Sequence, residues 1–334
     1  MEERPVTTTG VRQATALWCV AAGRYALRPA PQPLAGADTV RIAARYSAVS
    51  RGTERLVLEG RVPDSEADRM RCPNQEGEFP FPVKYGYAMV GEIVDGPAER
   101  RGERVFLLHP HQTLVTVPAA AAVAVPPAVP SRRATLAANM ETALNVVWDS
   151  RAAPGDHILV IGAGVVGLLV ARILARIPGT TVTVMDRDEA KRGVVSAMGA
   201  AFGAGALPGA PVDVAINASG SGAALTDAIA GAGLEARIVE ASWVGDGTVA
   251  VPLGGAFHSQ RLTLVSSQVG RVPAERAARW TTTRRLQTAL ALLDDPALDV
   301  LLTHNIAFGD APDCLPRLLT DDGPLAITLE YVPE

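Results

Sequence analysis

The stretch HILVIGAGVVGLLVARILARIPGTTVTVMD, residues 157–186, decides the fold of this chain. It begins with the apolar run His157–Ile161, which has the length of a strand, and continues through the glycine-rich turn Gly162–Gly167 into a helix-length apolar segment. A second strand-like run, Thr181–Asp186, ends in a carboxylate. A G-x-G-x-x-G pattern alone is weak evidence in a glycine-rich chain. The strand before it, the helix after it and the acid that closes the next strand together predict a dinucleotide-binding unit.

Each position of the turn has a physical role. Gly162 permits the tight change of direction, Gly164 lets the backbone approach a pyrophosphate, and Gly167 lets the helix lie close to the sheet. The N–H groups at the start of the helix, where Val165 and Val166 lie, would face the phosphates together with the positive end of the helix dipole.

The acid at the end of the second strand predicts which dinucleotide binds. Asp186 can accept hydrogen bonds from both hydroxyls of the adenosine ribose and would repel a 2′-phosphate. Arg187 could instead hold that phosphate. We expect Asp186 to dominate because it ends the strand and points at the ribose, so the sequence predicts NAD, with NADP the less favoured cofactor.

Length and composition limit the class of protein. The 334 residues exceed a usual single core, and 48% hydrophobic content with few aromatic residues is typical of a globular α/β protein. A net charge of -4 predicts neither a nucleic-acid-binding nor a membrane surface. The three cysteines, Cys19, Cys72 and Cys314, are far apart and form no CxxC pair. They favour a reducing cytoplasm, and residues 1–12 have no apolar core of signal-peptide length.

The rest of the chain contains two kinds of pattern. Residues 14–123 contain short strand-like runs broken by proline and glycine, which predict a small all-β barrel. A proline-rich linker follows, and then a helix over residues 131–150. After the glycine motif, strands alternate with helices, which predicts a parallel sheet covered on both faces. Further strands are expected to begin at Asp213, Arg237, Leu262 and Leu325. Further helices are expected after Asp188, which would be an N-cap, and over residues 274–293.

The order of these parts resembles the medium-chain alcohol dehydrogenase superfamily over nearly the whole chain. The matching sequences, besides residues 154–167, are Arg51–Glu54, Gly86–Val94, Gly102–Val105 and Asp213–Gly220. The resemblance implies an α/β protein with a GroES-like β-barrel catalytic domain, residues 1–130 and 271–334, and a Rossmann doubly wound parallel-sheet domain, residues 131–270. The nicotinamide would lie in the cleft between them. Residues 50–55 and 59–63 look most similar to the branch that includes the bacteriochlorophyllide hydroxyethyl dehydrogenases.

The sequence departs from this family at the catalytic metal. Zinc-dependent members bind the metal through a cysteine, a histidine, and a cysteine or glutamate before the Rossmann half. The matching positions here hold Arg51, Tyr87 and Ala138, none of which supplies the thiolate or imidazole that zinc prefers. The four-cysteine structural-zinc lobe is also missing. The resemblance therefore implies a zinc-free enzyme with no metal ligands.

Hydride transfer to a carbonyl builds negative charge on oxygen, so another group must donate a proton or hydrogen bonds there. Thr53 stands where the family has a hydroxyl relay, and Tyr87 could point a phenol at the same place. An ordinary turn threonine and a barrel-core tyrosine remain open alternatives. Lys84 could lower the pKa of a neighbouring phenol or bind an anion, although a solvated lysine is the plainer interpretation.

Further candidates for proton transfer are His109 and His111, since histidine titrates near neutral pH, and a structural hydrogen-bonding pair is the alternative. Glu141 flanks the lost third ligand, where a helix-capping role is also open. By resemblance, further residues would contact the cofactor, namely Thr142, Ala218, Ser242 and Gln268.

Three functions are compatible with these features. The first is a zinc-independent NAD(H)-dependent dehydrogenase or ketoreductase acting on a polar small molecule, and the second is a metal-free enoyl or quinone reductase. The third is a nucleotide-binding protein without turnover. The glycine motif and the proton donors favour the enzymes. The resemblance also suggests a homodimer joined through the Rossmann sheets.

Overall fold

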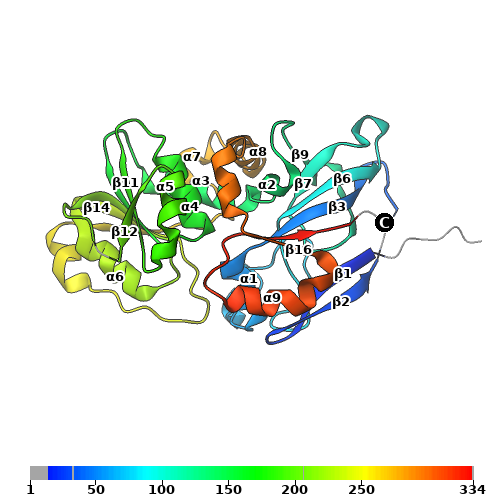
Figure 1. Cartoon of the computed structure of the whole chain (residues 1–334), viewed down its shortest axis with the longest axis horizontal. Helices are drawn as coiled ribbons and strands as arrows, with labels where there is room; N and C mark the ends of the chain where they lie inside the picture. Colours follow the sequence, from blue (N-terminus) through cyan, green and yellow to red (C-terminus); the bar gives the residue numbers. More distant parts are fainter. Residues whose placement is uncertain (1–13, 32–33, 206, 333–334) are drawn as a thin grey trace, which may run out of the picture.

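The structure is a computed structural model that describes residues 14–31, 34–205 and 207–332. Figure 1 shows an elongated molecule with two halves. One half contains the parallel sheet of the glycine motif, and the other contains the N-terminal strands together with the last strands of the chain. Residues 1–12, where the sequence predicts no signal peptide, lie outside the described residues.

A six-stranded parallel sheet forms the first half. Its strand order is β12-β11-β10-β13-β14-β15, with every neighbouring pair parallel. The chain therefore runs outward from β10 in one direction and then outward from β13 in the other, which is the order of a doubly wound fold. The strands are β10 His157–Ile161, β11 Thr181–Asp186, β12 Ala201–Ala204, β13 Val212–Asn217, β14 Ala232–Glu240 and β15 Thr263–Ser266.

Helices cover both faces of this sheet, as the alternation of side chains along β10 shows. Ile158 and Val160 belong to a large core cluster that includes residues of α3 and α4, whereas Leu159 and Ile161 belong to a separate cluster with α6. Successive strand residues point to opposite faces, so each face has its own helices. The helices of this half are α3 Ala137–Ser150, α4 Val165–Leu174, α5 Arg192–Ala197 and α6 Gly222–Gly231, with short turns η4 Glu189–Lys191 and η5 Leu253–Phe257.

The second half is the barrel predicted for the N-terminal part. Its central strand is β3, which pairs antiparallel with β6, β8 and β17. A smaller sheet has the order β2-β1-β5-β4. The strands are β1 Ala14–Ala21, β2 Arg24–Ala30, β3 Thr39–Val49, β4 Glu76–Gly77, β5 Val83–Lys84, β6 Met89–Asp95, β7 Arg104–Leu107, β8 Leu114–Pro118 and β9 Val123–Ala124. The short helices here are α1 Arg51–Leu58, η1 Asp64–Glu66, η2 Ala98–Arg100 and η3 Ala119–Ala121.

The C-terminal residues return to the barrel. Strand β17, Ile327–Glu330, pairs with β3 and with β16, His304–Ala307, so the red strand in Figure 1 lies among the blue ones. Between them lie η7 Phe308–Asp310 and α9 Ala311–Thr320. Helix α8, Thr282–Leu292, instead packs against α3 of the other half. The domain boundaries at residues 130 and 270 stay predictions.

Two predicted helices differ in detail from those observed. The helix expected over residues 274–293 is broken into α7, Ala274–Ala277, and α8, because the Thr281 hydroxyl accepts a hydrogen bond from the Arg284 N–H and caps a new helix. The helix expected over residues 131–150 is likewise divided into α2, Ser131–Ala134, and α3. The remaining turn of this region is η6, Pro296–Leu301. Asp188 caps η4 as expected, accepting from the Ala190 N–H.

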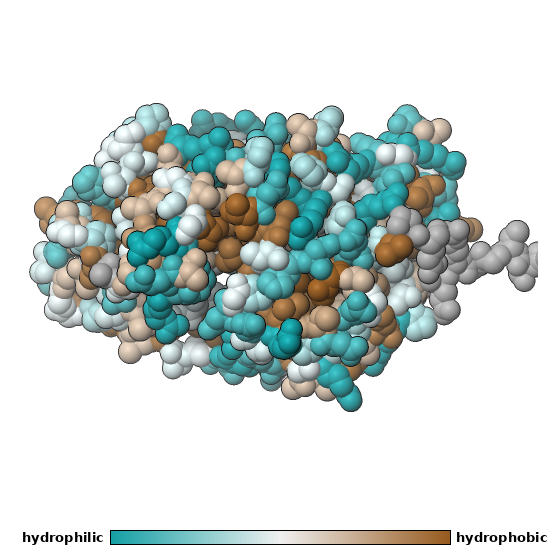
Figure 2. Space-filling view, viewed as in Figure 1, coloured by the Kyte–Doolittle hydropathy of each residue, from teal (hydrophilic) through white to brown (hydrophobic). Residues whose placement is uncertain are grey.

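The surface agrees with the modest net charge. Figure 2 shows hydrophilic and apolar residues interspersed over the coloured part of one face. Within the described residues, no helix has both the length and the apolar character needed to span a membrane.

Candidate functional site

The glycine-rich turn between β10 and α4 is closely packed on one side and open on the other. Gly162 has φ +104°, and a Cβ atom there would lie 2.8 Å from the Cα atom of Ser219. A Cβ atom on Gly167 would lie 2.0 Å from the Gly162 carbonyl oxygen. A Cβ atom on Gly164 would meet no protein atom within 4 Å. The backbone is therefore bare and accessible at Gly164, as a phosphate-binding turn requires.

Helix α4 begins at this open point. Gly164 is its N-cap residue and provides no side-chain cap, so the first N–H groups of the helix lack an intrahelical partner. Val165 and Val166 are partly exposed. Unpaired N–H groups at the positive end of a ten-residue helix are a suitable binding site for a pyrophosphate.

Asp186 lies beside the turn at the end of β11. Its carboxylate accepts hydrogen bonds from the N–H groups of Ala163, at 2.7 Å, and Asp188, at 2.9 Å. Lys191 approaches it at 3.3 Å. Burial raises the pKa of Asp186, but these hydrogen bonds and the lysine outweigh burial and lower it. The carboxylate is thus ionised at neutral pH, while the neighbouring Arg187 is exposed.

The loops after β13 and β14 close the same edge of the sheet. The Ser242 hydroxyl accepts a hydrogen bond from the Gly220 N–H at 2.9 Å, and the Ala218 N–H donates to the Ile161 carbonyl at 2.8 Å. The buried Asn217 amide donates to Glu240 at 2.7 Å and ties the two strand ends together. The sequence analysis did not select these two residues, although each is the last residue of its strand.

Two other predicted cofactor residues make local hydrogen bonds. The Thr142 hydroxyl donates to the Ala138 carbonyl one turn earlier in α3, at 3.0 Å. The side-chain amide oxygen of Gln268 accepts from the Gly270 N–H at 2.7 Å, and the residue is exposed just after β15. Their contacts with a cofactor stay predictions.

Tyr87 lies with Ser50 and Thr53 at the start of α1. Both hydroxyl side chains hydrogen-bond the phenol, and all three residues are partly exposed. Burial raises the pKa of Tyr87 to about 12, the two hydrogen bonds oppose this, and the charge of Glu54 adds to it. The ring also packs against both large hydrophobic clusters. The structure thus brings together two predicted catalytic residues, Tyr87 and Thr53.

A buried chain of hydrogen bonds joins Glu54, His111, Ser47 and Tyr331, of which the sequence analysis selected only His111 as a candidate. Glu54 accepts hydrogen bonds from the Ser50 N–H at 2.7 Å and from His111 Nε2 at 3.0 Å. His111 Nδ1 is 2.7 Å from the Ser47 hydroxyl, which also contacts the Tyr331 hydroxyl. The order serine, histidine, acid is that of a hydrolase triad, but Ser47 is fully buried and cannot reach a substrate.

Three predicted catalytic residues need correction. His111 is buried with both ring nitrogens engaged, so it has no free atom for a substrate. Lys84 is not solvated: it is 1% exposed, and its ammonium group contacts Glu76 and Gln112 instead of a phenol. Glu141 is buried in an ion pair with Arg285 at 2.9 Å. It therefore neither caps α3 nor is free to transfer a proton.

His109 is also buried, but within the described part of the chain only its Nδ1 atom makes a hydrogen bond. Its Nδ1 contacts the Pro110 carbonyl oxygen at 2.8 Å and so carries the proton. Burial lowers the pKa of His109 to about 4, and the charge of Lys84 contributes to the shift. His109 is therefore neutral at physiological pH and can accept, but not donate, through Nε2. Both His109 and His111 lie in the loop between β7 and β8.

The three positions that the sequence analysis matched to zinc ligands hold an arginine, a tyrosine and an alanine. The Arg51 guanidinium donates to the carbonyl oxygens of Pro324 and Asp321, and the Ala138 side chain has no atom that could bind a metal. Among the described residues, no group of three histidine, cysteine, aspartate or glutamate side chains could hold a metal. Guanidinium, phenol and methyl groups are not the N, S or carboxylate donors that zinc requires.

Comparison with known proteins identifies the fold. No family model matches the chain. A short chain alcohol dehydrogenase from Escherichia coli CFT073, complexed with NADH, is 18% identical with a TM-score of 0.76, over 96% of this chain and 99% of that chain. L-idonate 5-dehydrogenase from Escherichia coli K-12 is 12% identical with a TM-score of 0.78, over 96% and 98%.

TarJ from S. aureus, in complex with NADPH, is 16% identical with a TM-score of 0.74, over 96% of this chain and 100% of that chain. These similarities extend over both halves of the chain. They confirm the predicted fold, a GroES-like barrel combined with a Rossmann domain.

Proposed function

We propose that this protein is a nicotinamide-dependent oxidoreductase of the medium-chain dehydrogenase type. It transfers hydride between NAD(H) and an alcohol or ketone without a catalytic zinc ion. The observation that supports the proposal most strongly is Tyr87, whose phenol is hydrogen-bonded by Ser50 and Thr53 at a position where zinc-dependent relatives place a ligand. The open turn at Gly164 and the fold shared with NADH- and NADPH-bound dehydrogenases support the cofactor.

Different residues of the chain would bind the cofactor and transfer the proton. The turn at Gly164 and the start of α4 would hold the pyrophosphate, and Asp186 the adenosine ribose. The nicotinamide ring, when bound, carries the hydride. Tyr87 would donate its proton to the oxygen on which negative charge develops. A pKa of about 12 keeps this phenol protonated at neutral pH, so it is ready for the reduction direction.

In the oxidation direction the same phenol must accept a proton. The Ser50 and Thr53 hydroxyls would then stabilise the phenolate, while the buried charge of Glu54 opposes it. Reduction of a ketone is therefore the direction that the surroundings of Tyr87 favour. Since Lys84, His109 and His111 are buried, the preference for a polar substrate rests on the partly exposed Arg51 and on the three partly exposed hydroxyl groups.

A homodimer is part of the proposal. Strands β12 and β15 form the edges of the parallel sheet, and an edge strand presents unpaired N–H and C=O groups to a second copy. Sedimentation velocity would test this: a single species of monomer mass at micromolar concentration would contradict it.

The function itself is tested with two measurements on purified protein. NADH binding is measured first by calorimetry, and oxidation of NADH is then followed with a panel of ketones and a panel of enones. Turnover of a ketone supports the proposal. Turnover of enones alone would identify an enoyl or quinone reductase, and binding without any turnover would leave a nucleotide-binding protein.

A further inference from the structure

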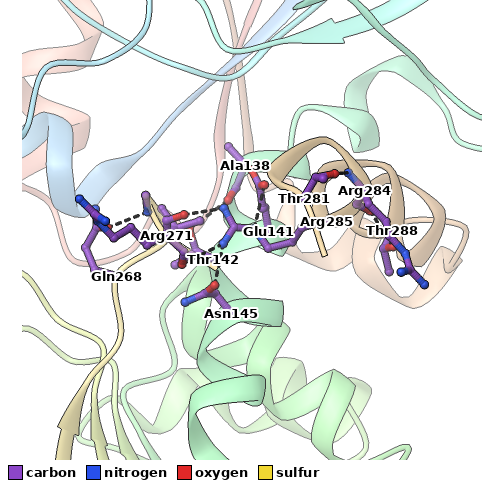
Figure 3. A network of polar contacts seen from close by, with 12 residues as sticks. Ala138, Glu141, Thr142, Asn145, Gln268, Arg271, Thr281, Arg284, Arg285 and Thr288 are labelled. Carbon is purple, nitrogen blue, oxygen red and sulfur yellow. Dashed lines mark hydrogen bonds and ion pairs between the residues drawn. The ribbon is translucent and has the colours of Figure 1, made fainter. Parts of the chain in front are cut away.

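Arg285 is a buried arginine that joins its own helix to the distant helix α3 and to the loop that follows β15. It belongs to α8, and its side chain is 2% exposed. Its Nε atom donates to Glu141 at 2.9 Å, and Nη1 donates to the Asn145 amide oxygen at 2.6 Å. Both partners lie on α3, on the side that faces α8 in Figure 3.

The same guanidinium reaches the loop that follows β15, here called the β15 loop and defined as residues 267–271. Nη1 donates to the Arg271 carbonyl oxygen at 3.3 Å, and Nη2 donates to the Val269 carbonyl oxygen. At the other end of the loop, the Ser267 hydroxyl donates to Asp149 of α3 at 2.6 Å. The β15 loop is thus attached to α3 at both ends. Ser267 makes one attachment directly, and Arg285 makes the other by binding two main-chain carbonyl oxygens of the loop.

Stability alone is a poor reason for this arrangement. Removing an arginine and a glutamate from water costs free energy, and burial indeed raises the pKa of Glu141 even with Arg285 beside it. Apolar side chains of similar size often stabilise a core at least as well. They cannot, however, bind two carbonyl oxygens of one loop and fix its backbone. The arrangement is therefore suited to holding the β15 loop in one conformation.

The position of that loop indicates what it contacts. Ligands of doubly wound sheets bind at the carboxyl ends of the strands, where the strand order reverses, here between β10 and β13. With the pyrophosphate at Gly164 and the adenosine ribose at Asp186 on β11, the other half of a dinucleotide must extend the opposite way. It therefore runs toward the loops after β13, β14 and β15.

We propose that Arg285 is a positioning residue that holds the β15 loop against the nicotinamide half of the cofactor. The inference rests on the proposed function, because it requires a bound nicotinamide dinucleotide. Arg285 does not touch the cofactor itself; it acts through the main chain of the loop. Its loss should therefore weaken binding of the nicotinamide half and leave binding of the adenosine half intact.

ADP-ribose, which lacks the nicotinamide, separates the two halves in an experiment. The variant is Arg285→Lys, which keeps a positive charge near Glu141 but cannot reach all four acceptors. The matched control is Arg133→Lys. Arg133 is also a buried clamp, bound to Asp299 through two hydrogen bonds and to the Leu293 carbonyl, but it has no hydrogen bond to the β15 loop.

We expect Arg285→Lys to raise the dissociation constant of NADH about tenfold, a loss of about 1.4 kcal/mol, while that of ADP-ribose changes less than twofold. The control variant should change neither. If Arg285→Lys does not fold, Ser267→Ala removes the other tie of the loop and should shift the two ligands in the same selective way. Equal weakening of both ligands, or no change in either, would overturn the inference. Failure of the unmodified protein to bind NADH would instead refute the proposed function.

Discussion

A Cβ atom added to Gly167 would lie 2.0 Å from the carbonyl oxygen of Gly162, whereas one added to Gly164 would meet no protein atom within 4 Å. The three glycines therefore have different roles. Gly167 allows α4 to pack on the turn, Gly162 allows the turn to pass close to the loop after β13, and Gly164 faces the space where a pyrophosphate would bind. This difference can be tested without knowledge of the substrate.

We predict that Gly164→Ala leaves the free energy of unfolding nearly unchanged but weakens NADH binding about tenfold or more, because the new methyl group enters the phosphate site. Gly167→Ala should instead destabilise the fold by about 2 kcal/mol, because the helix must move away from the turn. Urea unfolding and calorimetry measure the two quantities. Normal NADH binding by a stable Gly164→Ala protein would contradict the assignment of the turn.

The cofactor preference depends on Asp186. We predict a higher kcat/KM with NADH than with NADPH, because an ionised carboxylate binds a free ribose diol and repels a 2′-phosphate. Asp186→Ser should reduce this preference. Asp188→Ser, which changes the neighbouring helix cap, should leave it unchanged. A preference for NADPH in the unmodified protein would show that Lys191 and Arg187 outweigh the aspartate.

Zinc should be dispensable. Because Arg51, Tyr87 and Ala138 offer no suitable ligand set, we predict that purified protein carries no stoichiometric zinc and that chelators do not change its activity. Elemental analysis by mass spectrometry and an assay after dialysis against a chelator measure both. One tightly bound zinc per chain whose removal abolishes activity would refute this prediction.

The sequence was most informative where structure is local. The strand, turn, helix and strand of residues 157–186 follow from contiguous patterns, and all four are observed. Helix α1 was not predicted, because a glycine follows its first residue. It is held by the Glu54 side chain on the Ser50 N–H and by three buried apolar residues at its end, Leu56–Leu58.

The interpretation of single polar residues was less successful, because their partners are distant in sequence. Glu141 pairs with Arg285, which lies 144 residues later, and His111 pairs with Glu54, which lies 57 residues earlier. No local sequence pattern around Glu141 or His111 indicates such a distant partner. Lys84 was misjudged for a related reason, since the fold buries it between Glu76 and Gln112.

Acid should destabilise the protein through His109. The unfolded chain takes up a proton near pH 6.5, whereas the folded protein resists protonation of His109 down to about pH 4. The free energy of unfolding should therefore fall as the pH drops from 6.5 to 4, by on the order of 3 kcal/mol. His109→Gln should flatten this part of the profile, and His157→Gln, at an exposed position, should not. Urea unfolding at several pH values measures this pH dependence of the free energy of unfolding. Identical profiles for the unmodified protein and both variants would exclude His109 as its cause.

The central claim is that the Tyr87 phenol takes the place of a metal beside the reacting oxygen. The most direct test compares kcat for ketone reduction in Tyr87→Phe and in Tyr85→Phe. Tyr85 is the matched control, since its ring packs edge-on against Tyr87 at 6.0 Å and its hydroxyl donates to the Met70 carbonyl at 3.4 Å. We predict that Tyr87→Phe lowers kcat about a hundredfold with unchanged NADH binding, while Tyr85→Phe remains near normal. A Tyr87→Phe enzyme with normal kcat would contradict the claim and transfer the donor role to Thr53.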